Sequence, residues 1–265
     1  MNKLIIHIVQ IIIVISFIAL WEILSRLHII NTFIFSSPSK IYTCTITLFK
    51  SNNLLIHILV TLKETFIAFF LSVLISFIIA VLFYELPVLY KVFDPFLTII
   101  NSTPKVAIGP LIIILFGAGE KSIIIMALSI TLVINVLSIH NGFINADKYL
   151  LKLLNTLHAK RIEILKYLIF PSAYSVIINS LKINISMTLI GVIMGEFLVS
   201  KAGVGYLIIY GTQIFNLTLV ISGIIILMII SYVLYILISL IEKKLNKKHS
   251  WLQECFFFYS LLLTW

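Results

Sequence analysis

Apolar runs of about 20 residues recur along this chain, and no other feature restricts its fold as strongly. A helix needs about 20 mainly apolar residues to cross the hydrocarbon core of a bilayer. The candidate spans lie at about Leu4–Leu24, Ile56–Phe83, Phe96–Phe116, Ser122–Ile139, Ser175–Leu198 and Leu217–Ile241. The more polar segment Thr32–Asn53 predicts a connecting loop and a short helix. The pattern therefore predicts an all-α integral membrane protein with about six transmembrane helices.

The composition fits this class and excludes others. Hydrophobic residues make up 61% of the chain and charged residues 11%, whereas soluble domains average about 45–50% and 25%. The length of 265 residues suits one transmembrane domain, predicted over 1–251, with a short hydrophobic tail over 252–265. The first apolar run lacks a small-residue cleavage site, so we expect a retained helix and not a signal peptide. Cys44 and Cys255 have no metal-binding spacing, and no metal site is predicted.

The net charge of +9 predicts membrane orientation and not nucleic-acid binding, because the basic residues are scattered between apolar runs. Lysine and arginine near the ends of spans are retained in the cytoplasm. With six spans, one side carries eleven basic residues and the other five. The larger group is Lys3, Lys91, Lys148, Lys152, Lys160, Arg161, Lys166, Lys243, Lys244, Lys247 and Lys248, and the smaller is Arg26, Lys40, Lys50, Lys121 and Lys201. We therefore predict a multi-pass protein of the cell inner membrane with both termini in the cytoplasm.

The segment between the fourth and fifth spans is unusually long and basic, covering Asn141–Tyr174. Its apolar residues recur with helical spacing, at Leu150, Leu153, Leu154 and Leu157, then Ile162, Leu165, Leu168 and Ile169. Pro171 is predicted to end this pattern, because proline lacks the amide that a helix interior needs. Such a helix pair can lie flat on lipid or fit a groove on a partner. A solvated loop that only joins two spans is the alternative.

Several short motifs follow one another at characteristic distances. They are Trp21-Glu22-Ile23-Leu24-Ser25, Ser37-Pro38-Ser39, Asp94-Pro95-Phe96, Thr103-Pro104-Lys105-Val106-Ala107-Ile108-Gly109-Pro110-Leu111, Phe116-Gly117-Ala118-Gly119-Glu120, Gly195-Glu196 and Gly203-Val204-Gly205-Tyr206. In order and spacing this series resembles the permeases of bacterial binding-protein-dependent ABC importers. The resemblance is to the subfamily for sulfonates, taurine, nitrate and related small solutes, which also includes permeases for vitamin precursors.

The resemblance implies a type I importer permease fold with a coupling-helix loop between the fourth and fifth spans, at about 141–174. The family pattern of this loop is Glu-Ala-Ala, then Gly, then Leu-Pro. At these positions this chain has Lys152-Leu153-Leu154, His158 and Phe170-Pro171, so only the proline is kept. Leu157 and Ala159 flank His158 and match the leucine and alanine that flank the family glycine. The implied partners are an ABC ATP-binding subunit, a periplasmic solute-binding protein and a second copy in the bilayer. ATP is then hydrolysed by the separate subunit, so this chain is expected to be no enzyme and to bind no cofactor directly.

Two further features bear on the interior of the membrane domain. Broken helices at membrane depth are tolerated where protein or a water-filled cavity surrounds them, so the interrupted third span predicts part of the translocation path. The candidates are Asn101, Ser102, Thr103, Pro104, Gly109 and Pro110, with a packing kink as the alternative. The acid Glu196 is predicted either to face the path or a neighbouring subunit, or to cap the next turn. The Gly191–Gly195 pattern indicates close helix approach and a candidate dimer contact.

Two other functions remain open from the sequence. A channel or ion-coupled secondary transporter usually carries charges in mid-span, and this chain has few. A degenerate permease that no longer transports is suggested by the lost Glu-Ala-Ala and Gly of the coupling loop. Transport without any ATP-binding partner would favour the secondary transporter, and a bound partner without transport would favour the degenerate permease.

Overall fold

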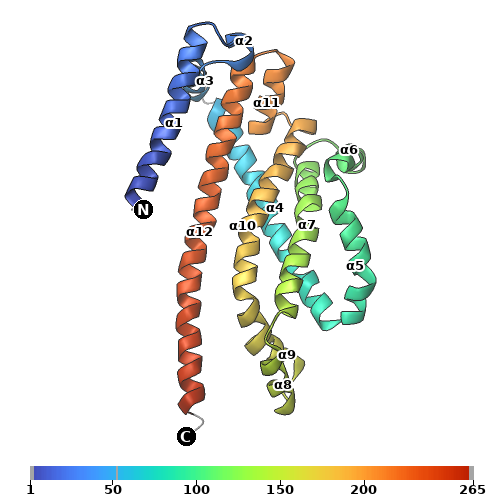
Figure 1. The fold of residues 1–265 in the computed structure, drawn as a ribbon. Helices are drawn as coiled ribbons and strands as arrows, with labels where there is room; N and C mark the ends of the chain where they lie inside the picture. The colour runs from blue at the N-terminus through green and yellow to red at the C-terminus, as the bar shows by residue number, and fades with distance from the viewer. Residues whose placement is uncertain (1–2, 52, 263–265) are drawn as a thin grey trace. The chain divides into compact units, whose positions relative to one another are not determined.

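The structure is a computed structural model that describes residues 3–51 and 53–262. Within those ranges all regular elements are helical, and Figure 1 shows their course. The α-helices are α1 (Lys3–Arg26), α2 (Thr32–Phe35), α3 (Pro38–Lys50), α4 (Asn53–Glu85), α5 (Pro87–Ser102), α6 (Gly109–Phe116), α7 (Glu120–Ile144), α8 (Lys148–Thr156), α9 (Arg161–Ile164), α10 (Phe170–Val199), α11 (Val204–Gln213) and α12 (Leu217–Leu262). A 3-10 turn, η1 (Lys105–Ile108), precedes α6, and a π-helical turn, η2 (Leu165–Ile169), precedes α10.

The helices match the predicted membrane spans closely. Five are long and apolar enough to cross a bilayer, and a sixth span results if the bent pair formed by α5 and η1–α6 is counted as one. This pair bends by 89°. The third span begins at Pro87, earlier than the predicted Phe96, because the Asp94-Pro95 step lies inside α5 and does not precede it. The prediction of an all-α protein with about six spans is confirmed.

The chain divides into two compact units, one with residues 1–63 and 196–229 and the other with residues 64–195 and 230–265. The divisions fall inside α4, α10 and α12. The backbone of α12 is helical through Leu262, which includes most of the predicted tail. The side chains of that tail, and residues 263–265, lie outside the described part.

The first unit joins the helices near the N-terminus to α11 and the start of α12. The Ser36 hydroxyl is 2.9 Å from that of Thr218, and the Ser25 hydroxyl donates to the carbonyl of Ser36. Glycines allow α11 and α12 to approach closely, since a Cβ at Gly223 would lie 2.6 Å from Ile208. Small and hydroxylated side chains therefore hold this unit together, as is usual between membrane helices.

The second unit is built on α4, α7 and α10, which pack through small and polar residues. Ala68, Ser72, Ser76 and Ala80 of α4 are fully buried. The Asn135 amide of α7 donates to the Ser72 hydroxyl at 3.0 Å. Polar side chains buried in a membrane protein need such partners, because neither water nor lipid supplies them there.

The Gly191–Gly195 pattern packs within the chain. A Cβ at Gly191 would lie 2.6 Å from the Ala127 Cα, and one at Gly195 would lie 2.9 Å from the Ile123 Cα. Both glycines therefore let α10 approach α7 of the same chain, and the expected dimer contact at this pattern is wrong. The pattern predicts close approach between helices and does not say which helix is the neighbour.

One charged residue of α10 lies in the apolar part of the second unit. Lys182 forms an ion pair with Glu242 of α12, and its amino group lies 6.0 Å from the centre of the Tyr235 ring. A partnered charge of this kind stabilises helix packing.

Candidate functional site

The segment between α7 and α10 forms two short helices joined by a tight turn, as Figure 1 shows for α8 and α9. The Asp147 carboxylate caps α8 by accepting from the backbone amides of Tyr149 at 2.7 Å and Leu150 at 3.4 Å. The Glu163 carboxylate accepts from the Lys160 amide at 2.7 Å and closes the first turn of α9. These caps satisfy amides that have no partner inside a short helix.

His158 turns the chain between α8 and α9. Its φ is 58°, in the left-handed region that glycine adopts most easily. The His158 amide donates to the Asn155 carbonyl at 3.1 Å, and the Ala159 amide donates to the Leu154 carbonyl at 3.0 Å. This pair of bonds is the Schellman motif, in which the left-handed residue is usually glycine. The loop therefore keeps the tight turn although histidine replaces the glycine of the family pattern.

The two helices present an apolar face. Leu150, Leu153, Leu157 and Ile162 are 46%, 54%, 68% and 77% exposed. The basic residues Lys148, Lys152, Lys160 and Arg161 are exposed around this face. We call the four exposed apolar residues the loop face. Exposed apolar side chains with a basic rim are typical of a docking surface.

The loop face rests on a buried base in the second unit. Ile164, Leu168 and Ile169 pack with Phe143 of α7 and Ala173 of α10. The Phe143 ring contacts the Phe170 ring with centroids 5.7 Å apart. Because one side of the segment is anchored in the core, the exposed side is held in a fixed position relative to α7 and α10.

Pro171 does not end the helical pattern as predicted. The residues Arg161–Val199 form one long helical run, with Pro171 half-buried at the second residue of α10. Directly before it lies the π turn η2, in which the Phe170 amide donates to the Leu165 carbonyl. A π turn changes the helical register and accommodates the kink that proline imposes. The helical pattern therefore connects the loop directly to α10.

The predicted path residues lie at the bend between α5 and α6. Asn101, Ser102, Thr103 and Pro104 are exposed, and the Lys105 amino group contacts the Asn101 carbonyl at 3.1 Å and its side-chain oxygen at 3.3 Å. The hydroxyls of Ser102 and Thr103 donate to carbonyls of their own helix end. Gly109 is buried and Pro110 is exposed, and both begin α6. The break in the span therefore lies at Thr103–Pro104 only.

Glu196 belongs to the first unit, where it caps α11. Its side chain is fully buried. One carboxylate oxygen accepts from the Thr61 hydroxyl at 2.6 Å, and the other accepts from the Gly205 amide at 2.6 Å. A negative charge at a helix N-terminus is favourable, because the first amides of the helix point towards it. Of the roles considered for this acid, the geometry therefore agrees with the capping of the next turn.

His57 and Thr61 complete this cluster, although no sequence motif pointed to them. The Val204 amide donates to the Thr61 hydroxyl at 2.8 Å, and the Gly203 amide donates to Nδ1 of His57 at 2.9 Å. The His57 ring also stacks on Tyr206. Three consecutive amides at the start of α11 thus have side-chain acceptors. The sequence did contain a signal for this cluster, because His57 and Thr61 are polar residues four positions apart in an apolar span and therefore share one helix face.

The predicted residues therefore fall into separate groups. Lys152, Leu153, Leu154, Leu157, His158 and Ala159 lie together in α8 and its turn, with Pro171 beyond the π turn. The path candidates share the bend between α5 and α6 in the same unit. Glu196 lies in the other unit.

The fold defines a multi-pass membrane protein with a structured helical loop. Comparison of its sequence with known protein families assigns the family. Residues 72–247 match the family described as binding-protein-dependent transport system inner membrane component. The match covers more than half of the chain, so the chain belongs to this family. It is a membrane-spanning permease subunit of an ABC importer.

Similar proteins agree with this assignment. A putative aliphatic sulfonates transport permease protein of Bacillus subtilis (strain 168) is 26% identical, covering 87% of this chain and 83% of the relative. A probable ABC transporter permease protein of Haemophilus influenzae is 30% identical, covering 82% and 87%. The taurine transport system permease protein of Escherichia coli (strain K12) is 21% identical, covering 88% and 86%.

Solved structures share the fold. The MetNI methionine ABC transporter in inward facing conformations superposes with a TM-score of 0.63 at 18% identity, covering 76% of this chain and 97% of that chain. An amino acid ABC transporter gives a TM-score of 0.59 at 18% identity, covering 77% and 97%. These matches confirm the predicted type I importer permease fold.

Proposed function

We propose that this permease conducts a small polar or anionic solute, such as a sulfonate or taurine, and is driven through the loop face by a separate ATP-binding subunit. The observation that carries the proposal is the loop face itself, four exposed apolar side chains with a basic rim on a rigid base. A free apolar surface of this kind outside the bilayer is stabilised when a partner covers it. The chain itself supplies no ATPase chemistry and holds no cofactor in this proposal.

The turn at His158 supports a working loop over a degenerate one. The substituted segment keeps both hydrogen bonds of the Schellman motif. It also keeps its buried base of Ile164, Leu168 and Ile169. A loop anchored in this way can transmit movement of a bound subunit to α7 and α10 as a rigid element.

The solute class rests on the relatives and on the chemistry of the bend. Relatives are described as permeases for aliphatic sulfonates and for taurine. At the bend, the Lys105 amino group lies beside Asn101 among exposed hydroxyls. The positive charge of Lys105 at this exposed bend suits a sulfonate or another small anion. The solute would be delivered by a periplasmic binding protein and would pass between two copies of the permease.

The excess of basic residues supports a cytoplasmic position for both termini and the loop face. Eleven basic residues lie on that side and five on the other. The ATP-binding subunit then approaches from the side where ATP is available.

The docking experiment compares two matched double variants. Leu153→Asp with Leu157→Asp places acids on the loop face, and Asn155→Asp with Thr156→Asp places the same acids on exposed positions of α8 outside it. The tagged permease is purified in mild detergent, and the co-purified ATP-binding subunit is quantified by mass spectrometry. We expect the first variant to lose about tenfold or more of the bound subunit, because two apolar contacts become buried charges, and the second to keep it.

Both variants should retain the apparent melting temperature of the wild type, because the mutated side chains are exposed. Equal retention of the subunit by both variants would refute docking at the loop face. Uptake of taurine by the permease alone in liposomes, without any ATP-binding subunit, would instead identify a secondary transporter.

The path is tested separately with Pro104→Ala. Removing the proline restores an amide at the break and lets α5 continue, which reduces the 89° bend. We expect uptake of a radiolabelled sulfonate into proteoliposomes to fall about tenfold while the ATP-binding subunit stays bound. Loss of the complex with this variant would show that the break serves packing and not transport.

A further inference from the structure

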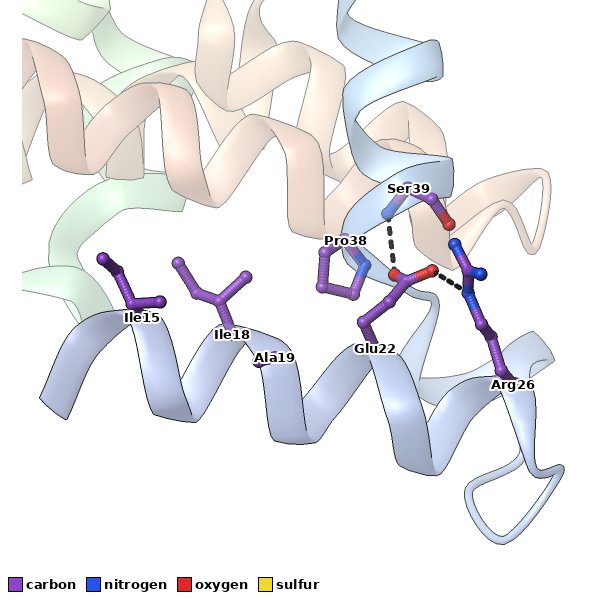
Figure 2. Close-up of a pocket in the computed structure, with 7 residues that line it drawn as sticks. All are labelled: Ile15, Ile18, Ala19, Glu22, Arg26, Pro38 and Ser39. Carbon is purple, nitrogen blue, oxygen red and sulfur yellow. Dashed lines mark hydrogen bonds and ion pairs between the residues drawn. The ribbon is translucent and has the colours of Figure 1, made fainter. Parts of the chain in front are cut away.

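A groove between α1 and α3 in the first unit has no role in the transport proposal. Its volume is ≈ 410 Å³, and Figure 2 shows its lining residues. They are Ile15, Ile18, Ala19, Glu22, Arg26, Pro38 and Ser39. Two motifs found in the sequence, Trp-Glu at the end of the first span and Ser-Pro-Ser at the start of α3, meet here.

One end of the groove is apolar and lies along a membrane span. Ile15 and Ile18 of α1 are 60% and 46% exposed, and Ala19 and Pro38 continue the wall. Only 6% of the span Ile8–Arg26 is buried within the chain. The apolar end is therefore the right environment for a hydrocarbon chain.

The other end is polar and carries both signs of charge. The Glu22 carboxylate accepts from the Arg26 Nε at 2.8 Å and from the Ser39 amide at 3.1 Å (Figure 2). The Ser39 amide belongs to the first turn of α3, so Glu22 also caps that helix. The Arg26 side chain is 76% exposed, which leaves most of its guanidinium open to a ligand. Arg26 ends the span, at the depth where lipid headgroups lie.

We propose that this groove binds one zwitterionic phospholipid with an amino headgroup, such as phosphatidylethanolamine. The phosphate would lie at the outer nitrogens of Arg26, the ammonium would lie at Glu22, and an acyl chain would run along Ile15 and Ile18. An arginine guanidinium commonly binds a phosphate through two parallel N–H···O hydrogen bonds. An acid fixed beside that arginine selects a headgroup with a positive end and disfavours a headgroup whose only charge is negative.

The geometry favours lipid over a second protein copy as the occupant. The groove combines an open apolar wall with one adjacent pair of opposite charges, and these match the two ends of a single amphipathic molecule. The bilayer also supplies phospholipid at a very high local concentration along the exposed face of α1. A bound lipid would hold α1 against α3.

The experiment measures lipid retained by the intact complex, or by the full-length permease where it purifies alone. Samples are reconstituted into nanodiscs of equimolar phosphatidylethanolamine and phosphatidylglycerol, extracted in mild detergent and analysed by native mass spectrometry. We expect the wild type to retain one phosphatidylethanolamine per chain. Arg26→Gln and Glu22→Gln should each lower its occupancy about tenfold, because each removes a charge-assisted contact.

Two further variants separate binding from folding. Ala19→Phe fills the apolar end and leaves the charge pair intact, so it should also lose the lipid without a change in melting temperature. Lys40→Gln removes a positive charge from exposed α3 surface outside the groove and should retain the lipid. Equal retention of the two phospholipids by the wild type, or full retention by Ala19→Phe, would overturn the proposal. Disulfide-linked dimers formed through Ile15→Cys would assign the groove to a second copy instead.

Discussion

Two turns in this chain use left-handed backbone in opposite surroundings. Gly203 precedes α11 with φ 117° and is buried. His158 follows α8 with φ 58° and is exposed. A Cβ at Gly203 would collide with the Glu196 carboxylate. The side chain of His158 extends into open surroundings.

The comparison separates two requirements that are often assigned together to glycine. A positive φ alone costs an ordinary residue about 1–2 kcal/mol, which a protein can tolerate at an exposed turn. A positive φ combined with a neighbour at contact distance leaves no room for any side chain. The first case explains how histidine can replace a glycine of the coupling-loop pattern. The second explains why position 203, which packs against the Glu196 carboxylate, is occupied by glycine.

The largest effect is expected from Gly203→Ala. The new methyl group would push the Glu196 carboxylate away from the Gly205 amide and the Thr61 hydroxyl, in a backbone region that is essentially restricted to glycine. We expect a loss of about 3–5 kcal/mol, from backbone strain and weakened charged hydrogen bonds. Thermal unfolding in detergent, followed by tryptophan fluorescence, measures the change.

Gly119→Ala is the matched control for this variant. Gly119 also has a positive φ, 136°, and precedes a helix, but no atom lies within 4 Å of its added Cβ. It should lose only the backbone contribution of about 1–3 kcal/mol. If the two alanines destabilise equally, the collision with Glu196 has no energetic weight and the comparison fails.

A smaller loss is expected from Thr61→Val, which keeps the shape of the side chain and removes its hydroxyl. The variant leaves the Val204 amide without this acceptor and Glu196 without this donor in a buried site. We expect the protein to lose about 2–3 kcal/mol. Thr43→Val is the control, since the Thr43 hydroxyl is exposed and bonds only within its own helix. A melting temperature equally unchanged in both variants would contradict the role of Thr61.

The sequence predicted the features that depend on neighbours along the chain. Apolar runs predicted the spans, and the spacing of Leu150, Leu153 and Leu157 predicted a helix with an apolar face that the structure leaves exposed. For Glu196, the motif suggested capping as one of its possible roles. These predictions succeeded because periodicity and capping act over a few residues.

Contacts between distant segments were not predictable in the same way. The Gly203 amide reaches His57 across 146 positions, and Val204 reaches Thr61 across 143. The pairing of Gly191 with Ala127, where a dimer contact was expected, has the same cause. Pro171 was misjudged for a local reason, because a π turn lets the helix continue and leaves no clear signature in the sequence.

The smallest effect, a gain in stability, is expected at the exposed turn of His158. His158→Gly removes the cost of a side chain at φ 58° but gives the unfolded chain more freedom, so we expect a net gain of about 0.5–1 kcal/mol. Leu157→Gly, at the preceding residue with φ −79°, should instead lose stability. The same thermal unfolding assay measures both.

Phe215 offers an independent repeat of this test. It follows α11 with φ 54° and makes the same pair of bonds, since its amide donates to the Thr212 carbonyl and the Asn216 amide donates to the Gly211 carbonyl. Phe215 is 74% exposed, so Phe215→Gly should gain a similar amount. A gain at both turns would show that His158 and Phe215 each carry the cost of a positive φ at an exposed turn. A loss at His158 with a gain at Phe215 would mean that the histidine ring makes a stabilising contact in the loop, and the comparison with Gly203 would then have to include it.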